Sequence, residues 1–171
     1  MMNEYSKLIG KKDLFAIQFK IEEVRNPYIW GHICYWINSM MIGNFESVTI
    51  LSDVFIFLPH IIYDNGNREH ESFYKMDKDK VFYLLSGQAF LNNHKYEEIA
   101  LTETWARFSI EMGLDVFVGT VVKLIEDKDN ARIIFSSDGK EVYDLYLKKG
   151  NVEDVFTCFS VQFNAIYDSI S

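Results

Sequence analysis

Two stretches decide the fold: FAIQFKIEEV at residues 15–24 and WGHICYWINSMMIG at residues 30–43. Apolar side chains alternate with others in both, at Phe15, Ile17, Phe19 and Ile21 and then at Ile33, Tyr35 and Ile37. Because successive side chains of a strand point to opposite faces, this pattern predicts two strands with one buried face. Asn38 and Ser39 supply the turn, and residues 40–42 are expected to pair back as a short strand.

Four short patterns in this region resemble one family of bacterial proteins: the FAIQF strand, the Trp30-Gly31 step, the Tyr35-Trp36-Ile37 core and the Ile42-Gly43 return. The chain is similar here to immunity protein 42, one of the small cytoplasmic immunity proteins of polymorphic toxin and contact-dependent inhibition systems. The resemblance implies an inhibitor that binds and neutralises a cognate C-terminal toxin domain. The matching residues are structural, so they transfer no active site.

Length and composition predict one domain over residues 1–171. Hydrophobic residues make up 49% of the chain and aromatic residues 16%, which excludes a disordered protein and allows a full core. The formal net charge is -8 and no basic cluster offsets it, which argues against a nucleic-acid partner. An acidic surface either serves solubility or fits a basic partner.

The two cysteines, Cys34 and Cys158, lie in apolar runs and are interpreted as reduced core residues. The first residues lack the apolar centre of a secretory signal, and no apolar run approaches the roughly 18 residues of a membrane span. The sequence therefore predicts a cytoplasmic protein with no membrane partner.

Helical and strand patterns follow one another in the rest of the chain. Residues 52–63 predict a short buried helix that Pro59 kinks or ends, residues 64–72 an exposed loop, and residues 78–86 a helix between an Asp77 cap and Gly87. Residues 104–111, 117–126, 131–136 and 141–147 predict a meander of strands, with turns at DKDN and at Asp138-Gly139.

Asn151 begins an amphipathic C-terminal helix whose apolar residues recur at helical spacing: Val152, Val155, Phe156, Phe159, Phe163 and Ile166. This stripe must lie on an apolar surface, and the meander is the expected one. The predicted fold is an α+β domain with a mostly antiparallel sheet and helices packed on one face.

The sequence contains no motif for catalysis, a cofactor or a metal. His32, His60, His70 and His94 lack the spacing of metal ligands and are interpreted as structural or surface residues. The glycines fit no nucleotide-binding loop, and no nucleophile elbow is present. Spacing alone leaves open a cysteine nucleophile paired with a distant histidine, although apolar neighbours argue against both thiols.

Carboxylates occur in close pairs that either face solvent or form an acid–base pair: Glu22 with Glu23, Glu69 with Glu71, Glu97 with Glu98, and Asp127 with Asp129. Spacing cannot separate these readings, and solvated surface is the preferred one. Acids also outnumber bases between residues 97 and 115, where Arg107 is the single base among Glu97, Glu98, Glu103, Glu111 and Asp115.

The predicted function is an immunity protein that neutralises a toxin domain, such as a basic nuclease, without catalysis. Glu97, Glu98 and Glu103 are the candidate acidic contacts, because an acidic patch attracts a basic partner. Tyr28, Trp30 and Tyr74 are the candidate aromatic anchors, with the alternative that Tyr28 and Trp30 complete a core. Two other functions stay open: a small enzyme whose carboxylate or cysteine site forms only in the fold, and a binding module that dimerises through the edge of the meander.

Overall fold

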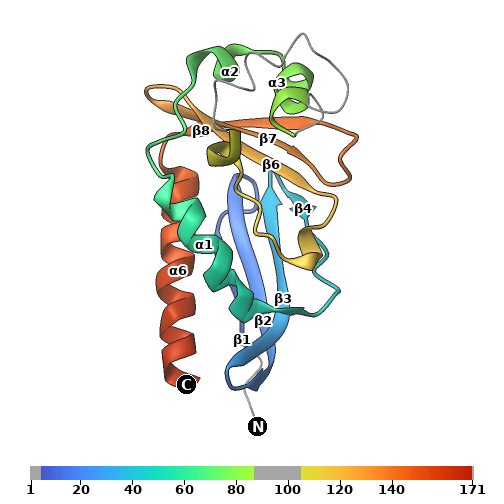
Figure 1. Cartoon of the computed structure of the whole chain (residues 1–171), viewed down its shortest axis with the longest axis vertical. Coiled ribbons are helices and arrows are strands. Elements are labelled where there is room, and N and C mark those ends of the chain that lie inside the picture. The colour runs from blue at the N-terminus through green and yellow to red at the C-terminus, as the bar shows by residue number, and fades with distance from the viewer. Residues whose placement is uncertain (1–4, 87–104, 171) are drawn as a thin grey trace. The chain divides into compact units, whose positions relative to one another are not determined.

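The computed structural model describes residues 5–86 and 105–170, which form two compact units (Figure 1). Unit 1 contains residues 5–63, 112–118 and 150–170, and unit 2 contains residues 64–86, 105–111 and 119–149. The backbone passes from one unit to the other repeatedly, so neither unit is a continuous stretch of sequence.

The sheet of unit 1 is antiparallel and has the order β1-β2-β3-β4, with β5 also paired to β3. Its strands are β1 (Tyr5–Gly10), β2 (Phe15–Arg25), β3 (Tyr28–Ile37), β4 (Met40–Ile42) and β5 (Thr49–Ile50). The predicted strands over β2, β3 and β4 are confirmed, as is the turn, where Asn38 and Ser39 both have positive φ. β1 was not predicted because it is an edge strand that buries only Ile9.

A short 3-10 turn, η1 (Leu51–Asp53), leads into helix α1 (Val54–Tyr63). The predicted helix is confirmed, and Pro59 lies inside it without ending it. The helix is not buried throughout, because only one side of it packs inward, through Val54, Leu58 and Ile61. Ile56 is 60% exposed on another side.

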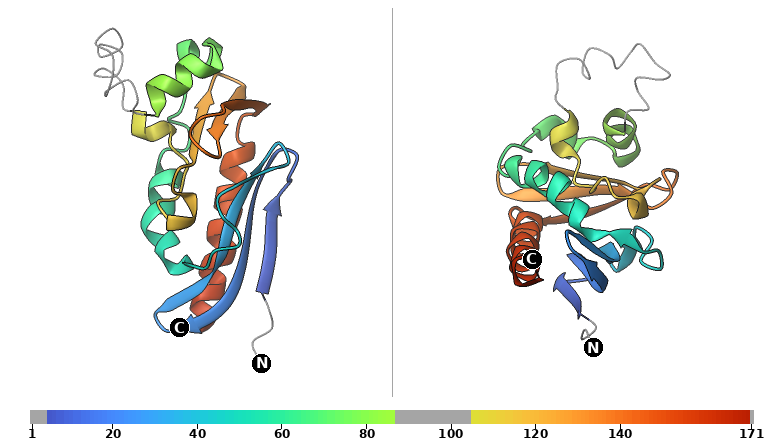
Figure 2. Two further views of the ribbon diagram at one scale, coloured as in Figure 1. Left: turned by 90° about the vertical axis from the view of Figure 1, so that its right-hand side faces the viewer. Right: turned by 60° about the horizontal axis from the view of Figure 1, so that its bottom comes forward.

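Helix α6 (Asn151–Ile170) packs on β2 and beside α1 (Figures 1 and 2). Phe19 of β2 lies 5.4 Å from Phe159 and 5.8 Å from Phe163 between ring centroids. Phe163 also contacts Phe55 of α1, at 5.4 Å. The prediction that this apolar stripe lies on the meander is wrong: the buried aromatic face of β2 is the surface that covers it.

Unit 2 has a three-stranded antiparallel sheet of order β6-β7-β8, formed by β6 (Val121–Glu126), β7 (Asn130–Ser136) and β8 (Tyr143–Lys148). Helices α2 (Glu71–Lys75) and α3 (Lys78–Leu85) supply much of its core, with Phe108 and sheet residues. The core residues are Phe73, Val81, Phe82, Leu84, Leu85, Phe108, Ile125 and Ile134.

The helix cap predicted at Asp77 is confirmed, since its carboxylate accepts hydrogen bonds from the backbone N–H groups of Asp79 and Lys80. Gly87 lies outside the described residues. The turn predicted at Asp138-Gly139 is present, but the connection runs from Ser136 to Tyr143 and is longer than a two-residue hairpin. The Asp138 carboxylate orders it by accepting the N–H groups of residues 140 and 141.

The strand predicted over residues 104–111 is wrong. Residues Trp105–Phe108 form a 3-10 turn, η3, and only Ser109 makes an isolated bridge, with Lys123 of β6. A second 3-10 turn, η4 (Asp115–Phe117) of unit 1, ends at the first residue of the strand predicted over residues 117–126, and the observed strand β6 begins only at Val121. The alternation in this segment reflects local turns with one buried side.

The loop predicted to be exposed over residues 64–72 is anchored by a buried arginine. Arg68 is fully buried and donates from Nε to the Arg107 carbonyl oxygen at 2.8 Å. The backbone of the loop also runs along β6, because Glu126 N–H donates to the Arg68 carbonyl and His70 N–H donates to the Glu126 carbonyl. An exposed loop is therefore the wrong description at Arg68, although Glu69 and Glu71 do face solvent.

The α+β class, the antiparallel pairing and the C-terminal helix are all confirmed. In the part of the chain that the structure describes, the strands lie in two sheets of five and three strands.

Candidate functional site

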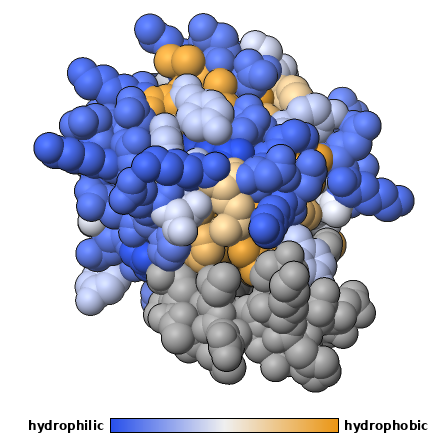
Figure 3. All heavy atoms as spheres, turned by 90° about the horizontal axis from the view of Figure 1, so that it is seen from above, coloured by the Kyte–Doolittle hydropathy of each residue, from blue (hydrophilic) through white to orange (hydrophobic). Residues whose placement is uncertain are grey.

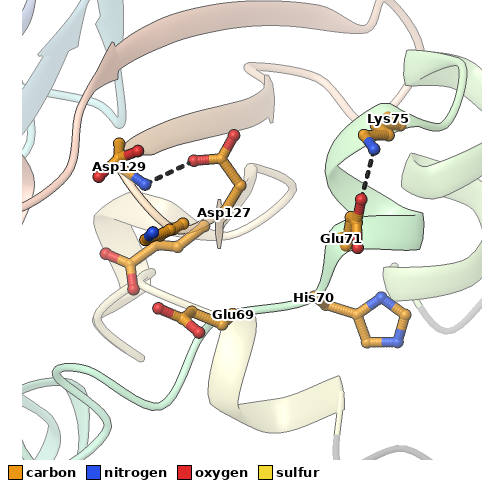
Figure 4. A pocket seen from close by; sticks show the side chains of 8 residues that line it. Glu69, His70, Glu71, Lys75, Asp127 and Asp129 are labelled. Carbon is orange, nitrogen blue, oxygen red and sulfur yellow. Dashed lines mark hydrogen bonds and ion pairs between the residues drawn. The ribbon is translucent and has the colours of Figure 1, made fainter.

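Unit 2 contains a hollow of about 530 Å³ between the start of α2 and the turn that joins β6 to β7 (Figure 4). Five carboxylates and two lysines line it together with one histidine: Glu69, His70, Glu71, Lys75, Glu126, Asp127, Lys128 and Asp129. We refer to it as the acidic hollow. Two of the carboxylate pairs noted in the sequence, Glu69 with Glu71 and Asp127 with Asp129, meet here.

One wall of the acidic hollow is the β6–β7 turn. The Asp127 carboxylate accepts hydrogen bonds from the backbone N–H groups of Asn130, at 2.6 Å, and Asp129, at 2.9 Å. These bonds to Asn130 and Asp129 lower the pKa of Asp127, so its negative charge is a permanent part of the turn at neutral pH. The Asp129 side chain is exposed beside it.

Beside the residues that line the hollow, Lys149 lies between two of their carboxylates. Glu126 is fully buried, and the Lys149 ammonium lies 3.7 Å from its Oε2. The same ammonium forms an ion pair with Glu69. Lys149 therefore offsets part of the negative charge, as a buried carboxylate requires.

The other wall is the first turn of α2, which His70 caps. His70 Nδ1 accepts the N–H of Phe73 at 3.1 Å, and the two rings stack with centroids 3.7 Å apart. Because Nδ1 is an acceptor, the ring proton lies on Nε2. Glu71 and Lys75 form an ion pair one helical turn apart, and its hydrogen bond lowers the pKa of Glu71 and raises that of Lys75.

Tyr74 lies on the same short helix and is half-buried. Its ring meets the exposed Tyr146 ring edge to face, with centroids 5.8 Å apart. Burial and then the nearby Asp127 charge raise the pKa of Tyr74. The backbone of Tyr74 is held as well, since Arg132 donates to its carbonyl oxygen at 3.0 Å. Tyr74 thus lies next to the acidic hollow with its backbone held by Arg132 and its ring against Tyr146.

Seen from the end where α2 and α3 lie, the surface is mostly hydrophilic with a smaller hydrophobic area between the polar groups (Figure 3).

Acid–base catalysis is a poor fit to the acidic hollow. A general acid needs a raised pKa, whereas the pKa values of Glu71 and Asp127 are lowered. Fixed carboxylates around an open hollow are suited to binding cationic groups.

The structure places the predicted interface residues in different settings. Tyr28 and Trp30 lie on β3 of unit 1, where Tyr28 is 51% exposed and Trp30 half-buried, so Tyr28 is not a core residue. Tyr74 flanks the acidic hollow of unit 2. Glu97, Glu98 and Glu103 lie outside the described residues.

The acidic hollow was not predicted from the sequence, because its two carboxylate pairs are far apart in the chain. The polar composition of residues 64–72 and the DKDN turn were both visible signals. No pattern in the sequence shows that these two segments are in contact, since the contact depends on the loop running along β6.

The two cysteines and the three described histidines have structural or surface settings. Cys34 is buried as predicted, but Cys158 is exposed on α6, so its prediction as a core residue is wrong. His32 Nε2 lies 2.8 Å from Glu22 Oε1, His60 is exposed, and His94 lies outside the described residues. Within residues 5–86 and 105–170, no three His, Cys, Asp or Glu side chains gather as metal ligands would.

The model of one protein family, Immunity protein 42 (Imm42), matches residues 1–162. The chain belongs to this family. The match confirms the family suggested by the N-terminal strands and the prediction that this protein is an immunity protein, which neutralises a toxin.

A crystal structure of CdiI from Burkholderia dolosa AUO158 is similar to the fold of this Imm42 protein. The TM-score is 0.72 at 16% sequence identity, and the match covers 91% of this chain and 99% of the other. No curated protein matches the sequence. In the described part of this Imm42 protein, every helix is too short or too polar to span a membrane.

Proposed function

We propose that this immunity protein neutralises its toxin in the cytoplasm by binding it directly, without catalysis, and that a basic surface of the toxin docks on the acidic hollow. The observation that carries the proposal is the gathering of five carboxylates around one open hollow in a protein of net charge -8. Complementary charge of this kind speeds association and selects the partner.

The charges of the hollow have different roles. Backbone N–H groups of the turn compensate the Asp127 charge, and Lys149 compensates the charge of the buried Glu126. Glu71 and Asp129 are exposed at the rim and are the carboxylates that a docking lysine or arginine would meet first. Their contribution falls as salt screens exposed charges.

Tyr74 would supply the anchor beside these charges. Arg132 holds its backbone carbonyl and the Tyr146 ring contacts its ring, which lowers the side-chain entropy that is lost when a partner covers it. Tyrosine is also among the residues that most often dominate interface energies.

The enzyme alternative has weaker support. Burial raises the pKa of Cys34 to about 12, which keeps the thiol protonated and unreactive at neutral pH. A homodimer is compatible with immunity. Within the described residues β8 pairs only with β7, and its other edge is the one that a second copy would use.

The first experiment is co-expression with the C-terminal toxin domain encoded immediately upstream. Growth rescue with copurification supports direct binding, and rescue without a complex contradicts it. Affinity and association rate are then measured for Glu71→Lys with Asp129→Lys, and for Tyr74→Ala. Glu46→Lys, on an exposed loop of unit 1, is the matched charge-reversal control.

We expect the double charge reversal to slow association about tenfold at low salt and less at high salt. Tyr74→Ala should weaken the complex by at least about tenfold, mainly through faster dissociation. If both variants bind like the control, the toxin docks elsewhere. Reversal of Glu97, Glu98 and Glu103 tests the acidic segment outside the described residues in the same assay.

A further inference from the structure

Unit 1 has a second hollow, of about 340 Å³, which has no part in the function proposed for the acidic hollow. Apolar side chains form much of its lining, among them Trp30 of β3 and both Ile56 and Phe57 of α1. Its charged lining residues are two aspartates, Asp53 and Asp115. We refer to it as the tryptophan hollow.

The backbone builds this hollow from three segments. β5 returns to pair with β3, where Trp30 lies opposite Ile50. The chain then turns into α1 through η1, which places Asp53 directly before the helix. The third segment crosses as residues 113–115, and a Cβ atom at Gly113 would lie only 2.4 Å from the Phe57 ring. The absence of a side chain at Gly113 lets the aromatic wall pack closely.

The two aspartates differ in the hydrogen bonds that their carboxylates make within the fold. Asp115 Oδ1 accepts hydrogen bonds from Thr49 Oγ1 at 2.6 Å and from Val116 N–H at 2.9 Å. Both bonds end on the same oxygen, which leaves Oδ2 for another donor. Among the described residues, the Asp53 carboxylate makes no side-chain hydrogen bond or ion pair, although its position at the start of α1 is favourable for an acid.

We propose that the tryptophan hollow receives an arginine side chain of the toxin. The proposal rests on the proposed function, direct binding of a toxin, and adds the chemistry of one contact. The apolar walls cover the methylene stem, the Trp30 ring stacks with the planar guanidinium, and Asp53 and Asp115 accept its N–H groups. A carboxylate or phosphate would be repelled by both aspartates.

The exposed apolar rim of the hollow also favours a side chain that a partner protein carries. Ile56, 60% exposed, and Val48, 45% exposed, line the hollow and would be covered by the backbone that carries the arginine. Burying these apolar groups excludes water from the ion pair and strengthens it.

The test uses the full chain and the toxin domain encoded upstream of it, with affinity measured by calorimetry. Asp53→Asn, alone and with Asp115→Asn, removes the charge with little change of shape, and an asparagine at 115 can still accept from Thr49 and Val116. Asp168→Asn, at an exposed aspartate on α6, is the matched control. Melting curves show whether each variant is folded. If the double variant unfolds, the affinity of Asp53→Asn alone tests the proposal, since the Asp53 carboxylate makes no side-chain hydrogen bond or ion pair among the described residues.

We expect the double variant to bind about tenfold to a hundredfold more weakly, with the control unchanged. Each arginine of the toxin is then replaced by alanine, and one such substitution should cost far less affinity in the Asp53→Asn background than in wild type. Unchanged affinity of both Asp53 variants, or no toxin arginine coupled to Asp53, overturns the proposal while direct binding stands.

Two further outcomes also overturn it. If the wild-type chain forms no complex with the toxin domain, direct binding and the arginine contact fail together. If the chain alone sediments as a dimer that Asp53→Asn dissociates, the occupant of the tryptophan hollow is a second copy.

Discussion

Arg132 of β7 and Asp144 of β8 form an ion pair across neighbouring strands, with Nη2 2.8 Å and Nε 3.1 Å from the same Oδ2 atom. The Arg132 side chain is only 3% exposed, and Nη1 donates to the carbonyl oxygens of Tyr74 and Met76. One guanidinium therefore joins the sheet of unit 2 to the end of α2, the helix that carries one wall of the acidic hollow.

We predict that Arg132→Ala lowers the free energy of unfolding by about 3–5 kcal/mol, because it removes a buried guanidinium and leaves two carbonyl groups and the Asp144 carboxylate without their donor. Arg25→Ala is the control, since Arg25 pairs with Glu23 in solvent and such a pair contributes at most about 1 kcal/mol. Urea unfolding measures both. Equal losses for the two variants would contradict the structural role of Arg132.

The Asp127 turn predicts a pH dependence. The folded pKa of Asp127 lies below its ordinary value of 3.8, so its contribution to stability is complete above that value and is lost as the pH falls through the folded pKa. We expect a carbon NMR titration to place the Asp127 midpoint below 3.8. Asp127→Ala should destabilise the protein at neutral pH and have less effect in acid. A midpoint at or above the ordinary value would contradict the hydrogen-bonded turn.

The two thiols should differ strongly in reactivity. Burial raises the pKa of Cys34 to about 12, against a smaller opposite effect of Lys12, whereas Cys158 is exposed. A thiol reagent at neutral pH should modify one cysteine rapidly in the folded protein and both after denaturation. Cys158→Ser should remove the rapid phase, and Cys34→Ser should leave it unchanged. A rapid phase that survives Cys158→Ser would show that Cys34 is accessible.

Gly31 explains one of the patterns through which the sequence resembles its family. A Cβ atom there would lie 2.0 Å from the Lys20 carbonyl oxygen, which belongs to the paired strand and cannot move aside. Gly31→Ala should cost about 3 kcal/mol, the upper end for overpacking, with a matching fall in melting temperature.

Gly66→Ala is the comparison for this prediction, because Gly66 has a positive φ but nothing within 4 Å of its Cβ position. Its cost should be only about 1–2 kcal/mol, from backbone strain. If Gly31→Ala cost less stability than Gly66→Ala, the close approach of the strands would not be the reason for a glycine at position 31.

Strands and helices with a regular apolar pattern were predictable because the pattern is local. β2, β3 and α6 alternate or repeat over many residues, and each appears near its predicted place. The segment 105–111 was mistaken for a strand because Phe108 and Ile110 are buried from a 3-10 turn and an extended connection, which give the same alternation. β1 was missed because an edge strand with one buried residue carries almost no pattern.

By itself, the sequence determined the α+β class, the strand pair that opens the chain and the membership of an immunity family, because alternation and glycine positions follow from neighbouring residues. Only the tertiary structure decided where the C-terminal helix packs and which charges meet. Glu69 and Glu71 reach Asp127 and Asp129 because the backbone around Arg68 runs along β6, and Trp30 reaches Asp53 and Asp115 because three separate segments meet at one hollow. Such contacts depend on long-range pairing, which local periodicity does not encode.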